Sequence, residues 1–397
     1  MFLAAAPYFQ RRFSSSDNLL RNFQSAILSV STVGNLGSMI ILTKLQARAN
    51  YPKRITVALT LYAITFMLLA ISTKLFLAVS AGVYFAFLML LVFTASLATG
   101  LCQNGVFAFV SGFGRDEYTQ AIMTGQGIAG VLPAITQIIS VLSVPAEQHN
   151  EGDLPQESST SAFAYFLTAT LVSSTTLIAF FHLLSHSRSR SCSRLNPPSH
   201  PDYETIDTTT STRKSIPLTH LLSKIPYLAL AVSTTFAITM FFPVFTVQIP
   251  SLHTPSSPHD SPRLLQPSAF IPLAFFCWNL GDLVGRTLPA LPFLRLTHRP
   301  RLLFLLSLVR IVFIPLYMAC NVGGRGAVIP SDVFYLVVVQ GLFGASSGYL
   351  GSSCMMGFAD YVLPEEREAA GGFMSLCLVA GLTAGSFLSF FAAGTGA

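Results

Sequence analysis

The sequence predicts an all-α integral membrane protein with about ten full membrane-spanning helices and a partial helix before them. Hydrophobic residues make up 52% of the chain, charged residues make up only 10%, and the mean hydropathy is +0.60. A soluble domain would carry about 25% charged residues. The apolar runs approach the ~20 residues that cross a hydrocarbon core as a helix. They also lack the alternation of apolar and polar residues that is typical of barrel strands.

The first ten residues are apolar but too short to cross a membrane. They lack the basic start of a signal peptide, so we expect the second half of a helix there, with its first half outside this chain. Full spans are predicted at 23–44, 54–78, 83–111, 118–143, 161–184, 225–248, 267–291, 302–321, 332–359 and 369–394.

Basic residues collect in alternate loops, which predicts that these loops are cytoplasmic and that the C-terminus lies outside. The basic residues are Lys44, Arg48, Lys53 and Arg54, then six in 185–224, then Arg295, Arg299 and Arg301. Segment 185–224 is rich in Ser, Thr, Pro and Arg and has no helical periodicity, so we expect a disordered linker. It would separate an N-terminal half, 1–184, from a C-terminal half, 225–397.

The remaining composition excludes several classes of function. The net charge of +6 is explained by topology, so we expect no nucleic-acid partner. The six cysteines are scattered without a CxxC pair, so neither a metal site nor a disulfide framework is predicted. We expect no cofactor. No nucleophile–base arrangement indicates an enzyme.

One predicted span contains ionisable residues. In the segment 278–286, Asn279, Asp282 and Arg286 lie at i, i+3 and i+7 and therefore form one stripe on a helix. Charged groups inside a bilayer are costly and usually line a polar pathway. The stripe is either a substrate site or an intrahelical Asp282–Arg286 pair that neutralises itself and packs the bundle. Gly281 and Gly285 suit both, because they allow close helix approach.

Two earlier spans also carry polar or glycine-rich features. Gln103 lies near the middle of 83–111, where its amide could bond a base edge or a ribose hydroxyl, or simply join two helices. The stretch 124–130, TGQGIAG, resembles a phosphate loop but lacks the Lys-Ser/Thr ending, so we interpret it as a helix-packing surface. The sequence thus contains no sign of a nucleotide-hydrolysing motor.

Arg310 is the second intramembrane cation. We interpret it as a structural partner for an acid or for backbone carbonyls freed by Pro315. The run 365–368, Glu-Glu-Arg-Glu, is interpreted as a solvated cytoplasmic turn, with a gate that pairs with basic residues as the alternative.

Several of these blocks, in this order, resemble the equilibrative nucleoside transporter family. The blocks are Gln103-Asn104-Gly105, the TGQGIAG run, WNLGDLVGR at 278–286, RIVFIPLYMACN at 310–321, SSGYLGSSCM at 346–355, and the stretch from Glu368 to Phe390. The resemblance covers nearly the whole chain, and the Asn-x-x-Asp-x-x-Gly-Arg pattern is its most specific part.

The resemblance implies a bundle similar to the major facilitator fold, with a cytoplasmic loop between two groups of helices. It implies facilitative transport of nucleosides, or of nucleobases, at the plasma membrane or a vacuolar or lysosomal membrane. Gln103 would bond the base, Asp282 would accept from the base or sugar, Arg286 would meet the ribose hydroxyls, and Asn279 would shape the pocket. Candidates for gate or structural roles are Leu3, Arg310, Tyr349 and Glu368. Proton coupling through Asp282 is an alternative transport mode.

The chain departs from the family pattern at two places. Ser347 stands where the family usually has Asn, and the Leu-Pro-Trp-Asn motif of the first helix is absent, which predicts a start at an internal Met or a truncated product. Two other functions therefore stay open. One is a non-transporting membrane scaffold or receptor, and the other is a carrier of a different polar solute, such as a sugar.

Overall fold

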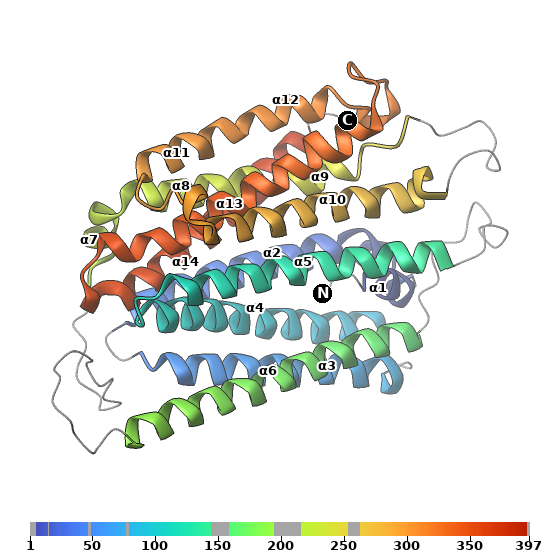
Figure 1. The fold of residues 1–397 in the computed structure, drawn as a ribbon. Coiled ribbons are helices and arrows are strands. Elements are labelled where there is room, and N and C mark those ends of the chain that lie inside the picture. The colour runs from blue at the N-terminus through green and yellow to red at the C-terminus, as the bar shows by residue number, and fades with distance from the viewer. Residues whose placement is uncertain are drawn as a thin grey trace. The chain divides into compact units, whose positions relative to one another are not determined.

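The computed structural model describes residues 5–14, 16–46, 49–76, 79–143, 159–193, 216–252 and 263–394. Within these ranges the regular structure is entirely helical (Figure 1). Nine of the described helical segments are long and apolar enough to cross a membrane, and each overlaps a predicted span. The remaining predicted span, 267–291, corresponds to the helix Pro267–Thr287, which carries the polar stripe. The chain is an all-α, multi-pass membrane protein.

The helices form two compact units. Unit 1 comprises Met1–Val106 and Glu151–Ser215, and unit 2 comprises Phe107–Asn150 and Ile216–Ala397. Unit 1 holds α1 (Ala6–Phe13), α2 (Asp17–Lys44), α3 (Tyr51–Leu75), most of α4 (Ala81–Ser111) and α6 (Ser159–Ser193). Unit 2 holds α5 (Asp116–Ser143), α7 (Leu218–Lys224), α8 (Pro226–Thr239), α9 (Phe241–Thr246), α10 (Pro267–Thr287), α11 (Pro300–Val309), α12 (Phe313–Met318), α13 (Leu342–Gly357) and α14 (Arg367–Gly394). The predicted halves 1–184 and 225–397 stay a prediction.

Unit 1 is organised around an aromatic cluster. Phe9 and Phe13 of α1 are fully buried, and they contact Phe166 of α6 and Phe23 of α2, respectively. The first ten residues thus contribute to a helix, as expected, although α1 extends to Phe13 and residues 1–4 lie outside the described part of the chain. A partly buried polar contact also joins α3 to α4, because Arg54 Nη1 donates to Asn104 Oδ1 at 2.6 Å.

The central feature of unit 2 is the close pairing of α10 with α13. Gly281 and Gly285 of α10 lie against the backbone of α13, and Gly344 and Gly348 of α13 lie against the backbone of α10. A Cβ atom at any of these four positions would meet backbone atoms closer than 3.0 Å. Glycine therefore allows the two backbones to touch, as small residues do at membrane helix interfaces.

Three helix interruptions lie in unit 2. α8 gives way to α9 at Met240, and α11 gives way to α12 through the 3₁₀ segment η5 (Arg310–Val312). The π-helix η7 (Phe334–Gly341) precedes α13. Interruptions of membrane helices persist only where other groups satisfy the freed backbone, and π-helices are frequent at functional sites.

The segment 185–224 corrects one prediction. We expected it to be irregular throughout, but α6 continues to Ser193 and α7 occupies Leu218–Lys224. A helix that is already nucleated in the membrane extends at little cost, which accounts for the end of α6. In α7, leucines at positions 218, 221 and 222 share one face, and Leu221 is buried. The residues between, 194–215, lie outside the described part.

Candidate functional site

The polar stripe of α10 contains a buried ion pair. Arg286 Nε donates to Asp282 Oδ2 at 2.6 Å, one helical turn apart, and the two residues are 8% and 5% exposed. The intrahelical pair that the spacing allowed is therefore present.

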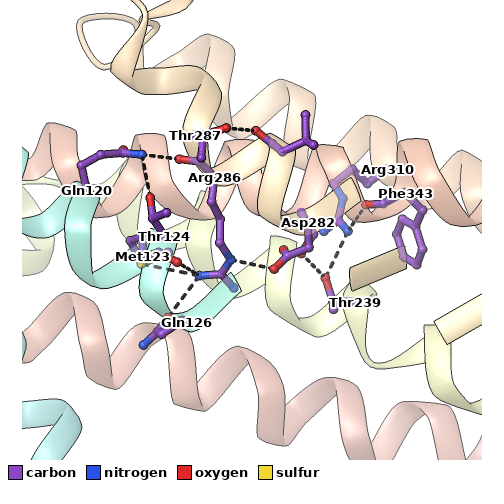
Figure 2. Close-up of polar contacts among 12 residues, drawn as sticks. Gln120, Met123, Thr124, Gln126, Thr239, Asp282, Arg286, Thr287, Arg310 and Phe343 are labelled. Carbon is purple, nitrogen blue, oxygen red and sulfur yellow. Dashed lines mark hydrogen bonds and ion pairs between the residues drawn. The ribbon is translucent and has the colours of Figure 1, made fainter. Parts of the chain in front are cut away.

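Arg286 also reaches across to α5, as Figure 2 shows. Its Nη1 donates to the Met123 carbonyl at 3.3 Å and to Gln126 Oε1 at 3.1 Å. In return, Gln120 Nε2 donates to the Arg286 backbone carbonyl at 2.5 Å. The described contacts thus use Nε and Nη1 of Arg286, and Nη2 makes no hydrogen bond within the described residues.

The glycine-rich run of α5 makes this approach possible. A Cβ atom at Gly127 would lie 3.0 Å from Arg286 Cδ and 3.1 Å from Leu283 Cα, and at Gly130 it would collide with the Asn279 amide. This confirms that the TGQGIAG stretch is a helix-packing surface. α10 is therefore held by α5 on the face of Asn279 and Arg286, and by α13 on the face of its own glycines.

One carboxylate oxygen of Asp282 has no hydrogen-bond partner among the described residues. Asp282 Oδ1 is buried and accepts no hydrogen bond from any described residue, while Oδ2 is used by Arg286. A buried carboxylate oxygen normally has a partner, so an orphan of this kind requires an explanation. Asn279 Nδ2 donates to the Phe275 carbonyl at 2.8 Å within α10 and does not supply that partner. The pair can therefore offer a polar ligand one acceptor, Asp282 Oδ1, and one donor, Arg286 Nη2.

Arg310 lies near this pair within unit 2 and is 2% exposed. Its guanidinium donates to the backbone carbonyls of Thr235 and Phe343 and to the hydroxyls of Thr239 and Ser346. Carbonyl partners were predicted for Arg310. The carbonyls it contacts belong to α8 and α13, however, not to the turn that Pro315 interrupts.

The other sequence-predicted candidates belong to other elements or lie outside the described residues. Gln103 is half-buried on α4, in unit 1, so its role in the site stays a prediction. Tyr349 OH donates to the Leu294 carbonyl at 2.6 Å, and Glu368 packs against the end of α4, where its Oε1 would lie 2.9 Å from a Cβ at Gly112. Leu3 lies outside the described residues.

The interpretation of 365–368 as a solvated turn is wrong for Glu366. This residue is 8% exposed. Its carboxylate accepts hydrogen bonds from Lys224 Nζ at 2.6 and 2.8 Å and from the Leu363 amide at 3.0 Å, and it lies 3.1 Å from His220 Nε2. Both His220 and Lys224 belong to α7. An acid in a charged run can become buried when a distant basic helix folds over it, which local sequence does not reveal.

Sequence reasoning missed the polar residues of α5. Gln120 and Gln126 contact Arg286, whereas the glycines of the run 124–130 predict close helix packing and no polar contact. A glutamine inside an apolar, glycine-rich membrane helix is itself a signal, since its amide needs a partner there. Thr239 and Ser346 carried no comparable signal, because hydroxyls commonly bond to their own helix.

The match to a family model identifies the class of protein. The nucleoside transporter model matches residues 87–393, which extend from α4 to the end of α14. The chain belongs to the nucleoside transporter family. The matched region includes the Asp282–Arg286 pair, the α5 run and Arg310, so the geometry described above lies inside the part that the family shares.

Individual relatives agree with this membership. The nucleoside transporter FUN26 of Saccharomyces cerevisiae is 29% identical, with 98% of this chain and 80% of the relative covered. Equilibrative nucleoside transporter 1 of Homo sapiens is 28% identical, with 98% and 92% covered. A crystal structure of FucP, a major facilitator superfamily transporter, superposes with a TM-score of 0.59 at 14% identity and covers 98% of this chain and 91% of its own. The fold is therefore of the major facilitator type, as expected.

Proposed function

We propose that this chain is a facilitative carrier that moves nucleosides, with nucleobases as further substrates, across a membrane by alternating access. Membership of the nucleoside transporter family and the major facilitator type of fold support a carrier rather than an enzyme or a scaffold. The single observation that carries the site assignment is the buried Asp282–Arg286 pair with its unpartnered oxygen. The membrane proposed is the plasma membrane or a vacuolar or lysosomal membrane.

The chemistry of the pair suits a nucleoside. A ribose hydroxyl is both donor and acceptor, so it can donate to Asp282 Oδ1 while it accepts from Arg286 Nη2. Hydrogen bonds to charged groups contribute about 1.5–3 kcal/mol each, roughly twice the usual value, when water is excluded. Trp278 precedes this stripe and stacks on Phe242 with ring centroids 4.2 Å apart, which supplies an apolar, aromatic neighbourhood. Small-molecule sites combine such walls with a few polar groups.

Uptake of radiolabelled uridine and adenosine in cells that lack nucleoside transport tests the proposal. We expect Asp282→Asn and Arg286→Ala each to lower uptake by about tenfold or more, because each removes a charge-assisted contact. Asp360→Asn is the matched control, since this carboxylate is exposed and lies 3.7 Å from the imidazole of His298. Each variant is compared at equal amounts of surface protein.

Three results would contradict the proposal. Wild-type protein at the cell surface without uptake favours the scaffold, and sugar uptake that excess nucleoside does not compete favours another solute. Near-normal uptake by both site variants returns the pair to a packing role.

The same assay tests proton coupling. Uptake that rises at acidic external pH and is abolished by a protonophore shows that transport is coupled to protons. Uptake that neither condition changes shows uncoupled transport.

A further inference from the structure

Arg310 is a buried cation whose hydrogen-bond partners among the described residues are all neutral. It opens η5, the short 3₁₀ segment between α11 and α12. Its Nε donates to Ser346 Oγ at 3.0 Å, its Nη1 to the Thr235 carbonyl, and its Nη2 to Thr239 Oγ1 at 3.1 Å and to the Phe343 carbonyl at 3.4 Å. The guanidinium also lies 4.6 Å from the centre of the Phe343 ring. These contacts hold the Arg310 guanidinium against α8 and α13. None of the described residues that it contacts is an acid.

The acid that acts on Arg310 is Asp282. The two residues make no direct ion pair in the described part of the chain, yet they attract each other electrostatically, and Arg286 attracts the same carboxylate through direct contact. In Figure 2, Asp282 lies between the side chains of Arg286 and Arg310. Opposite charges attract each other without direct contact in a medium of low dielectric constant, because screening by water and salt is weak there.

The two arginines are held very differently. Arg310 is locked by four acceptors on two helices and is 2% exposed. Arg286 has one acidic partner, and all its donor contacts to α5 come from Nη1: the carbonyl of Met123 at 3.3 Å, the Sδ of Met123 at 3.9 Å, and the exposed side chain of Gln126 at 3.1 Å. Of the two cations, Arg286 is therefore the one with a terminal nitrogen, Nη2, that makes no hydrogen bond within the described residues and can donate to a ligand.

We propose that Arg310 is a positioning residue, a fixed counter-ion that keeps Asp282 compensated when Arg286 divides its donors between Asp282 and a bound nucleoside. Removing one partner of a buried ion pair normally leaves an uncompensated charge, which is strongly unfavourable. With two arginines and one acid the cluster carries one net positive charge, so Arg286 can share its guanidinium with the electron-rich oxygens of a ligand while Arg310 continues to offset the charge of Asp282. This inference rests on the proposed function.

Transport measurements test the role of the charge at position 310. We expect Arg310→Gln to raise the KM for uridine by about tenfold, since a charge that supports the site is lost while hydrogen-bonding capacity remains. Arg310→Lys keeps the charge and should retain most of the affinity. Arg325→Gln, a change at an exposed arginine of the same unit, is the matched control. Equal KM values for Arg310→Gln and wild type, or equal impairment of the Gln and Lys variants, would overturn the proposal.

Thermal unfolding of the purified full-length protein in detergent tests the coupling without any substrate. Arg286→Gln combined with Arg310→Gln leaves Asp282 with neither cation, so the double variant should lose more stability than the sum of the single changes. Adding Asp282→Asn should restore much of that loss. Arg310→Gln should destabilise the wild type more than it destabilises the Asp282→Asn variant. An equal loss of stability in both backgrounds would show that Arg310 is only a structural clamp and would reject its role as a counter-ion. Absence of uptake in the wild type would instead reject the proposed function.

Discussion

The α10–α13 contact makes a quantitative prediction for Gly285→Ala. The new Cβ would lie 2.8 Å from the carbonyl carbon and 2.9 Å from the Cα of Ala345, and closer still to the carbonyl oxygen. Ordinary van der Waals contact begins at 3.4 Å, so the carbonyl carbon alone requires the two helices to separate by about 0.6 Å, and the nearer carbonyl oxygen requires more. A gap of about 0.5–1 Å already removes a quarter to a half of each atom pair's attraction. We therefore expect a destabilisation of about 1–3 kcal/mol, the range typical of overpacking.

The assay is thermal unfolding in detergent, followed by nucleoside uptake at equal surface expression. Gly125→Ala is the matched control, because a Cβ there would meet nothing within 4 Å and alanine favours a helix by about 1 kcal/mol over glycine. We expect the control to be neutral or slightly stabilising, and Gly285→Ala to lower both the melting temperature and uptake. If the two alanine variants melt and transport alike, the backbones do not make the contact described and the reasoning fails.

Two further predictions concern other buried polar groups of unit 2. Gln340→Ala should destabilise the protein by about 1–3 kcal/mol in the same melting assay. The Gln340 amide accepts a hydrogen bond from Tyr317 and donates to Tyr335 and Thr246 inside the core, so all three hydroxyls would lose this bond. Glu366→Gln should release α7 from the rest of unit 2, since the neutral amide can no longer form the ion pair with Lys224. Trypsin should then cleave after Lys224 faster than in the wild type. An unchanged cleavage rate would show that other contacts hold α7.

The sequence predicted where helices lie better than it predicted how they are interrupted. Long apolar runs are directly visible, so every described span was found near its true bounds. The breaks at Met240 and Arg310 and the π-helix before α13 were not predicted. Each depends on what distant residues do for freed backbone groups, as the bond from Arg310 to the Thr235 carbonyl shows. Local sequence does not contain that information.

The same limit applies to the candidate site. The spacing of Asp282 and Arg286 determined their pairing, because residues four apart on a helix must face the same way. The partners on α5 were missed, since Gln126 is far from Arg286 in the sequence and only the packing around Gly127 brings them together. Which helix packs on which face is a tertiary property, and the polar pattern of one helix cannot supply it.

The reciprocal glycines of α10 and α13 also restrict how this molecule can move. Two helices whose backbones interlock at four points have no space to slide or tilt against each other, because close-packed interiors transmit displacement instead of absorbing it. α10 and α13 must then travel as one rigid pair. Spectroscopic probes on the exposed side chains of Leu280 and Leu342 should report one constant separation through the whole cycle. Any change that opens or closes a path must then leave the α10–α13 pair intact.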